Sequence, residues 1–224
     1  MAEQQALAKR MRFTSDFVTI KAISGDKTET FHVHEEIIKE RSEYFRAAFD
    51  RRWKEGKARE IEMQEELPDT IASYLEYIYG GSVSSTSDRD NAHRVEVSVR
   101  LLRLYVFGEK IQDDDFCDAV LSMLATRCDE KDSDERRWYP INEAVHLLYA
   151  GTPSGSPARS FLVDMHLQHG NIRWLEVDVK YHHPEFLLDL ARQFMLTKDH
   201  MPHQSAASQL HKWLKKTKKG TEQG

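Results

Sequence analysis

The residues with the clearest potential for chemistry lie in one stretch, "FHVHEEIIKERSEYFRAAFDRRWKE", from Phe31 to Glu55. Its "HEEII" begins like the zinc-binding helix of a metalloprotease, but the second histidine of that motif would stand where the chain has Ile38. His32 and His34 could share one face of a strand, yet two histidines without a nearby cysteine are an incomplete metal site. We predict no metal and no cofactor, with a two-histidine metal site as the alternative.

Other kinds of catalytic machinery are also missing from the sequence. The stretch "GTPSGSP" lacks the Gly-x-Ser-x-Gly pattern of a serine nucleophile and suits a turn before a helix. There is no glycine-rich phosphate loop ending in Gly-Lys-Ser/Thr and no Gly-x-Gly-x-x-Gly after a strand. The eleven histidines are scattered over polar stretches, among them His182, His183, His200 and His203, and we expect them on the surface. The sequence therefore predicts a non-enzymatic protein, and an enzyme with an unrecognised site is the alternative.

Composition narrows the class of protein further. The chain has 224 residues, of which 40% are hydrophobic and 10% aromatic, enough for a buried core in one domain or in two halves that share a core. Its formal net charge of -5 argues against a protein built mainly to neutralise phosphates. We therefore do not expect nucleic acid to be the main partner.

The cysteines and the N-terminal residues indicate the compartment. Cys117 and Cys128 are eleven residues apart and so share one face of a helix, which favours buried thiols over metal ligands or a disulfide. The start of the chain, "MAEQQALAKRMRF", has no apolar signal segment, and no run of residues approaches the length of a membrane span. We predict a protein without a membrane partner, in the cytoplasm, the nucleus or both.

The first half of the chain alternates strands with helices. Alternation from Phe17 to Ile23, the turn "SGDKTE" and the stretch "TFHVH" predict a β-hairpin, and "REIEM" predicts a third strand. Between them, helical spacing predicts two helices, the second capped by Ser42. A further helix begins near Pro68 and stops at the pair Gly80-Gly81. Residues 82–94 have no inward-facing periodicity and predict a mobile loop.

The rest of the chain is predicted to be helical throughout. Helical spacing resumes in "VSVRLLRLYVFGEKI" and in "DDDFCDAVLSMLATRC", whose leading aspartates suit the positive end of a helix dipole. Beyond the charged joint "DEKDSDERR" we expect helices in "PINEAVHLLYAG", "SPARSFLVDMHLQHG", "PEFLLDLARQFM" and "QSAASQLHKWLKK". Ser156 is the expected N-cap of the second of these, and Gly170 its stop.

The order of these elements and several residues within them resemble the BTB (POZ) domain. The residues that match its pattern are Ser15, Asp16, Phe31, His34, Ser42, Tyr44, Phe45, Glu55, Pro68, Ile78, Tyr79 and Gly81. "LLRLYVFGEKIQDDDFCDAVL" is similar to the helical pair that closes this domain, and the later helices resemble the C-terminal extension of fungal members. The resemblance implies an α+β fold, a small mixed sheet flanked by helical hairpins and followed by an all-helical extension. It also implies that His34 is structural and links strand to helix.

The expected domain boundaries follow from this resemblance and from composition. They are an N-terminal tail at 1–12, a BTB/POZ-like domain at 13–130 with the mobile loop 82–94, a helical extension at 131–210 and a basic tail at 211–224.

The same resemblance implies a module for protein–protein interaction, and two functions of that kind are open. One is a substrate adaptor that docks a cullin-type ubiquitin ligase scaffold, because "WKE" stands where cullin-binding members carry hydrophobic-x-Glu. Trp53, Lys54, Glu55 and Phe49 are the candidate interface residues; packing of Trp53 on its own domain is the alternative. The other is a nuclear transcriptional or chromatin regulator that self-associates and binds co-repressors.

One departure from the family pattern bears on a homodimer. Members that form the domain-swapped dimer usually carry Lys or Arg after the histidine, opposite an acidic residue of the first strand, whereas this chain has Asp16 and Glu35. Two buried carboxylates cannot both stay charged without a large cost, so that dimer would be strained. Arg10, Arg12 or Lys39 could supply the missing positive charge.

The lysine-rich tail is the remaining charged feature. Its lysines are Lys212, Lys215, Lys216, Lys218 and Lys219. We expect a solvated end; a nuclear-import signal or a patch that binds nucleic acid weakly is the alternative.

Overall fold

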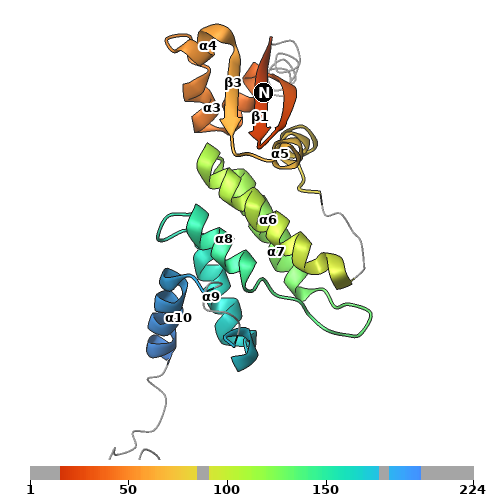
Figure 1. Ribbon diagram of the computed structural model, residues 1–224, viewed down its shortest axis with the longest axis vertical. Helices are drawn as coiled ribbons and strands as arrows, with labels where there is room; N and C mark the ends of the chain where they lie inside the picture. Colours follow the sequence, from red (N-terminus) through yellow and green to blue (C-terminus); the bar gives the residue numbers. More distant parts are fainter. Residues whose placement is uncertain (1–15, 85–90, 177–181, 198–224) are drawn as a thin grey trace, which may run out of the picture.

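The structure, a computed structural model, describes residues 16–84, 91–176 and 182–197. The sheet and its short helices lie at one end of an elongated molecule, and the later helices extend away from them (Figure 1). In chain order the elements are β1 (Phe17–Ser24), β2 (Lys27–His34), α2 (Glu35–Arg41), α3 (Glu43–Ala48), α4 (Lys54–Ala58), β3 (Glu60–Gln64), α5 (Pro68–Gly80), α6 (Asn91–Ile111), α7 (Asp114–Asp129), α8 (Glu143–Gly151), α9 (Pro157–His169), the 3-10 helix η1 (Ile172–Trp174) and α10 (Pro184–Thr197). The predicted α+β fold with a helical extension is confirmed.

The sheet is mixed, with strand order β2-β1-β3. β1 runs antiparallel to β2 and parallel to β3, so the predicted hairpin and third strand are both present. The turn is shorter than expected: Ser24 pairs with Lys27, and only Gly25 and Asp26 connect the strands. Gly25 has φ +58, a conformation that suits glycine in a two-residue hairpin turn. β2 therefore begins three residues before "TFHVH", because the polar residues from Lys27 onward continue the ladder.

Two side chains, Ser42 and Asp113, cap the N-termini of helices α3 and α7. The Ser42 hydroxyl accepts a hydrogen bond from the Phe45 amide at 3.1 Å, as predicted, and donates one to the Ile111 carbonyl at 2.5 Å. Asp113 accepts from the Phe116 amide at 2.9 Å and from the Tyr74 hydroxyl at 2.9 Å. Burial raises the pKa of Asp113. Each cap thus serves its own helix and also ties it to a distant element.

The predicted loop at 82–94 is partly wrong. Helix α6 begins at Asn91, inside the range that was expected to be a loop. Val83 is buried in the core, so the segment after α5 holds an anchoring side chain that periodicity did not reveal. Residues 85–90 lie outside the described part of the chain.

The helical extension shares one core with the BTB-like half. A single cluster of buried side chains runs from Val18 in β1 to Phe186 in α10. Helix α8 approaches α6 so closely that a Cβ on Gly151 would lie 2.4 Å from a Val106 methyl. Ser156 precedes α9 as predicted, but its hydroxyl does not cap that helix; it donates to Glu109 of α6 at 2.7 Å. The two halves are therefore packed against each other rather than linked loosely.

Within the described ranges, no helix is long and apolar enough to cross a membrane.

Candidate protein-interaction site

A groove of about 630 Å³ lies beside the sheet, between helices α3 and α4 and strand β3. Its walls are formed by Tyr44, Ala47, Ala48, Trp53, Lys54, Glu55, Ala58, Glu60, Ile61 and Glu62. The groove therefore gathers three of the predicted interface residues, Trp53, Lys54 and Glu55, into one surface.

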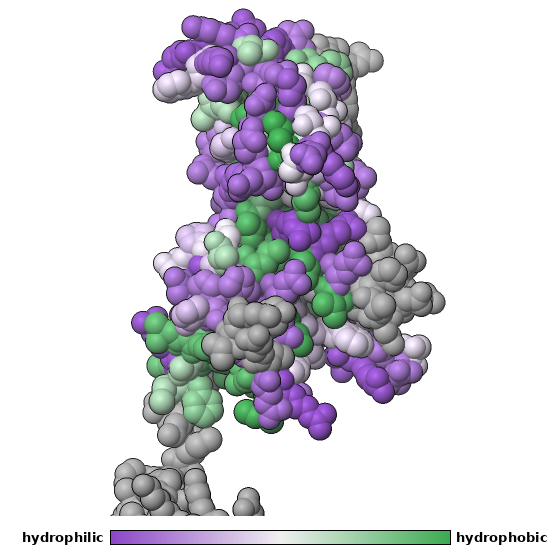
Figure 2. All heavy atoms as spheres, in the orientation of Figure 1, coloured by the Kyte–Doolittle hydropathy of each residue, from purple (hydrophilic) through white to green (hydrophobic). Residues whose placement is uncertain are grey.

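Trp53 is the dominant apolar side chain of this surface. It is 62% exposed, although it stands at the start of α4 among charged residues. The space-filling view shows a mostly hydrophilic surface over this end of the molecule (Figure 2). A tryptophan this exposed does not contribute its full area to its own core, so the alternative in which Trp53 packs on its own domain is not supported.

A tight turn before α4 holds Trp53 in place. The Trp53 amide donates to the Asp50 carbonyl at 3.0 Å, and a Cβ on Gly56 would lie only 2.1 Å from that same oxygen. Only glycine allows α4 to lie this close to the turn. The Asp50 carboxylate is hydrogen-bonded by Arg52, which lowers the pKa of Asp50 to about 2. The position of Trp53 therefore depends on the close approach of the α4 backbone to the preceding turn, and not on extensive packing of its side chain against the core.

Phe49 does not belong to the exposed interface, and its prediction as a contact residue is wrong. It is only 2% exposed. Its ring stacks on Phe45 with 6.0 Å between centroids, and Phe45 in turn stacks on Tyr74. Phe49 ends α3 with its ring turned inward, so it stabilises the domain from within and leaves Trp53 to face outward.

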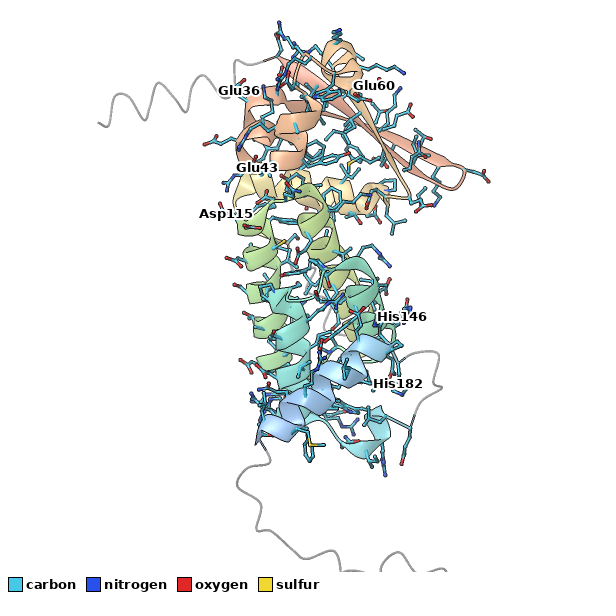
Figure 3. The ribbon with its side chains drawn as sticks, turned by 90° about the vertical axis from the view of Figure 1, so that its left-hand side faces the viewer. Glu36, Glu43, Glu60, Asp115, His146 and His182 are labelled. Carbon is cyan, nitrogen blue, oxygen red and sulfur yellow. The ribbon has the colours of Figure 1, made fainter. Side chains whose placement is uncertain are left out.

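The groove carries a negative charge that the sequence did not reveal. Glu55, Glu60 and Glu62 line it, against Lys54 alone among the lining residues. Figure 3 labels Glu60 at the sheet end of the molecule. Glu60 is also paired with Lys21 of β1 at 2.5 Å, which neutralises part of its charge. Glu60 and Glu62 were missed because only the position of β3 beside α4 brings them to the site.

Asp16 and Glu35, the predicted pair of carboxylates, do lie close together, but only Glu35 is largely buried. The Asp16 side chain is 78% exposed and that of Glu35 14%. Arg59 lies between them, with its guanidinium 2.9 Å from Asp16 and 3.0 Å from Glu35. Lys39 adds a second cation to Glu35 at 3.1 Å, as expected for one of the residues proposed to supply charge. Both acidic positions therefore have a cationic partner within one chain, and the expected strain of the domain-swapped dimer stays a prediction.

Arg59 is the residue of this cluster that the sequence did not indicate. It follows α4 with φ +56, a left-handed conformation that is uncommon outside glycine. From there its guanidinium also donates to the Phe17 carbonyl at 3.0 Å. Arg59 thus joins the start of β1, the start of α2 and the start of β3.

The histidines of the opening stretch have structural partners. The Nδ1 atom of His34 lies 2.8 Å from the hydroxyl of Tyr79, which confirms the predicted link from strand to helix. His32 faces Thr19 across the hairpin, with 3.3 Å between its Nδ1 and the threonine hydroxyl. Among the residues that the structure describes, no three His, Cys, Asp or Glu side chains form a group that could hold a metal ion.

Three histidines of the extension, His166, His182 and His183, are partly buried, contrary to the prediction that the histidines lie on the surface, whereas His146 is exposed as predicted. His166 packs edge-on against Trp174 and Phe186, and His183 packs against His146 and Tyr149. Burial lowers the pKa of His166. His200 and His203 lie outside the described residues.

The two cysteines are buried and free, as predicted. Burial raises the pKa of each thiol to about 12, so both stay protonated at neutral pH. A protonated, buried thiol is a poor nucleophile and a poor ligand.

The described residues thus form a small mixed sheet with helices packed against it and a groove at its side. In agreement, residues 9–114 match the family model of the BTB/POZ domain. The chain is a BTB/POZ-domain protein with a helical C-terminal extension. Its BTB/POZ domain is a module for protein–protein interaction. No curated protein matches the chain.

Proposed function

We propose that this protein is an adaptor that docks the helical N-terminal domain of a cullin-type ubiquitin ligase scaffold in the groove beside Trp53. The observation that carries the proposal is the 62% exposure of Trp53 at the rim of a groove of about 630 Å³. Large aromatic side chains that fill a partner's pocket dominate the energy of many interfaces.

The composition of the groove supports one class of partner surface. Tyr44 and Ala47 contribute an apolar floor on α3, and Glu55 and Glu62 contribute negative charge at its edges. A helix that carries one apolar stripe flanked by basic residues complements both properties. We propose that the scaffold presents such a helix.

The experiment measures binding of the full chain to the N-terminal domain of a cullin by titration calorimetry. Trp53→Ala is expected to weaken binding at least about tenfold, since removing an anchor of this kind costs about 2 kcal/mol or more. Glu55→Lys is expected to weaken binding and to reduce its dependence on salt, because it removes one attractive charge.

The matched control is Ile172→Ala. Ile172 is an exposed apolar residue of similar exposure, 68%, but it lies in η1 of the extension. Its substitution is expected to leave binding unchanged. Absence of binding by the unsubstituted chain would exclude the cullin proposal, and equal losses for Trp53→Ala and Ile172→Ala would show that the groove is not the site.

A second function, a nuclear transcriptional or chromatin regulator that self-associates, is favoured by a separate observation. Phe17 at the start of β1 is 54% exposed and packs against His34 with the two rings tilted and 4.3 Å between their centroids, beside the exposed Tyr79. An exposed aromatic group at a strand end suits contact with a second chain. Sedimentation of the full chain and of Phe17→Asp tests it, and a monomer in both cases would contradict self-association.

The location of the protein belongs to the same proposals, in the cytoplasm for the adaptor and in the nucleus for the regulator. The lysine run from Lys212 to Lys219 lies outside the described residues. A fluorescent fusion that lacks residues 211–224 is expected to lose nuclear accumulation if the run is an import signal, and an unchanged distribution would contradict that role.

A further inference from the structure

Strand β3 has one paired edge and one open edge. It ends the strand order β2-β1-β3 and runs parallel to β1. The Thr19 amide donates to the Arg59 carbonyl at 2.9 Å, and the Glu65 amide donates to the Ile23 carbonyl at 2.7 Å. Because the backbone groups of a strand point to alternate sides, the even-numbered residues of β3 direct their amides and carbonyls away from β1. These residues are Glu60, Glu62 and Gln64.

The outward backbone groups of these three residues lack hydrogen-bond partners within 16–84, 91–176 and 182–197. An edge with unpaired amides and carbonyls is a template for the addition of another strand. The open edge of β3 can therefore bind an extended segment through main-chain hydrogen bonds.

The groove beside Trp53 runs along this open edge. Helices α3 and α4 form one side of the groove and β3 forms the other. Figure 1 shows β3 between β1 and these two helices. Binding by strand addition combines an open edge, which gives main-chain hydrogen bonds, with neighbouring pockets that select alternate side chains. β3 and its groove supply both.

Charge selects the kind of strand that fits this edge. Glu55 and Glu62 line the groove and form no ion pair with any residue that the structure describes, whereas Glu60 is paired with Lys21. Neighbouring side chains of opposite charge stabilise a pair of strands, and like charges destabilise it. A basic residue opposite Glu62 therefore fits. A second copy of β3 does not fit, because it would place glutamates opposite glutamates.

The alternation of side chains along β3 adds a second constraint. Successive side chains of a strand point to opposite faces of the sheet. Glu60 and Glu62 share the outer face of β3, and Ile61 is buried on the inner face, beside the groove that Tyr44 and Ala47 of α3 also line. An added strand matches both faces if basic and apolar residues alternate along it.

We propose that an extended segment of a partner protein, with basic and apolar residues in alternation, pairs with β3 as a fourth strand of the sheet. This occupant differs from the scaffold helix proposed above. Because both use the same groove, only one of them can be bound at a time. The strand proposal does not rest on the cullin proposal, since its test contains no cullin.

Fluorescence anisotropy of the full chain with a labelled seven-residue peptide of alternating lysine and valine tests the proposal. Saturable binding is expected. The same peptide N-methylated on every backbone amide keeps its charge but cannot donate to β3, so it is expected to bind at least about tenfold more weakly. Glu62→Gln is expected to weaken binding about threefold, as for one cross-strand charge pair. The matched control, Glu29→Gln, removes an exposed carboxylate of β2 and is expected to leave binding unchanged.

Hydrogen exchange measured by NMR locates the peptide on the sheet. With saturating peptide, the amides of Glu60, Glu62 and Gln64 are expected to exchange at least about tenfold more slowly, because they become donors to the added strand. The Thr30 amide, in the opposite edge strand β2, is expected not to change.

Three results would each overturn the inference. They are no binding of the unmodified peptide, equal binding of its N-methylated form, and protection that appears in β2 instead of β3. Equal losses for Glu62→Gln and Glu29→Gln would show that the charge at the edge of β3 does not select the strand. A failed titration with the cullin domain leaves all of these readouts unchanged, so the two proposals can fail separately.

Discussion

The guanidinium of Arg59 lies 3.0 Å from the carboxylate of Glu35, and the two residues join the start of β3 to the start of α2. The Glu35 side chain is 14% exposed, so this ion pair is shielded from water over most of its surface. The pair gives Glu35 a cationic partner within the same chain.

Arg59→Met is expected to lower the free energy of unfolding by about 1–3 kcal/mol, because a mostly buried carboxylate loses a partner. The Phe17 carbonyl loses its side-chain donor as well. Urea unfolding of Arg59→Met, Glu35→Gln and the double variant measures the coupling, and the double variant is expected to be more stable than the sum of the single losses predicts.

The matched control for this cluster is Asp16→Asn. Asp16 binds the same guanidinium but its side chain is 78% exposed, so its loss should cost less than about 1 kcal/mol. Equal costs for Asp16→Asn and Arg59→Met would show that burial of Glu35 does not govern this cluster.

His166 is expected to make the extension less stable in acid. Burial lowers its pKa from the ordinary value of 6.5, so the unfolded chain binds a proton at a pH where the folded chain does not. Stability is therefore fully present above pH 6.5 and is lost as the pH falls through 6.5 toward the lowered folded pKa. Thermal unfolding between pH 7.5 and pH 5, compared with His166→Phe, measures the effect. Parallel curves for the two proteins would contradict the role of His166.

Local sequence information was enough to predict most elements of the fold. Ser42 as an N-cap and the Gly80-Gly81 stop depend on groups within a few residues, and both are found: Ser42 accepts from Phe45, and Gly81 ends α5 with φ +79. The hairpin was predicted for the same reason, from alternation and a glycine turn. The family match over residues 9–114 confirms the resemblance on which the fold class was based.

The parts that were missed depend on contacts between residues far apart in the chain. Arg59 reaches Glu35 only because β3 pairs in parallel with β1, a register that no short pattern encodes. Phe49 and Trp53 are both aromatic and close in sequence, but the turn after α3 leaves Phe49 buried and Trp53 exposed. The Ser156 hydroxyl bonds Glu109 instead of its own helix because α9 docks beside α6.

Arg159 is expected to be the most sensitive polar residue of the extension. Its guanidinium donates to the Tyr149 carbonyl at 2.8 Å and to Glu185 at 2.5 Å, and it lies 4.5 Å from the centre of the Tyr149 ring. Lysine has a single nitrogen and cannot reproduce this fork, so Arg159→Lys should cost about 2–4 kcal/mol. Chemical unfolding measures the loss, and hydrogen exchange should locate it in α8, α9 and α10.

The control for Arg159 is Arg192→Lys on the neighbouring helix α10. The side chain of Arg192 is 67% exposed and pairs with Asp189 at 3.5 Å. An exposed pair of this kind is worth less than about 1 kcal/mol, so Arg192→Lys is expected to be nearly neutral. If Arg159→Lys were equally neutral, the guanidinium would not be what holds α10 to the rest of the extension.

Gly56→Ala should both lower the stability of the domain and distort the groove beside Trp53. The added Cβ would lie 2.1 Å from the Asp50 carbonyl oxygen, which is backbone and cannot move aside without shifting the turn that carries Trp53. We expect a loss of about 1–3 kcal/mol in urea unfolding, as for other overpacked sites. Gly80→Ala is the matched control, because nothing lies within 4 Å of its Cβ, and it should be neutral or slightly stabilising. If Gly56→Ala were as stable as Gly80→Ala and bound the same partners, the close approach of α4 to the turn would not be what positions Trp53.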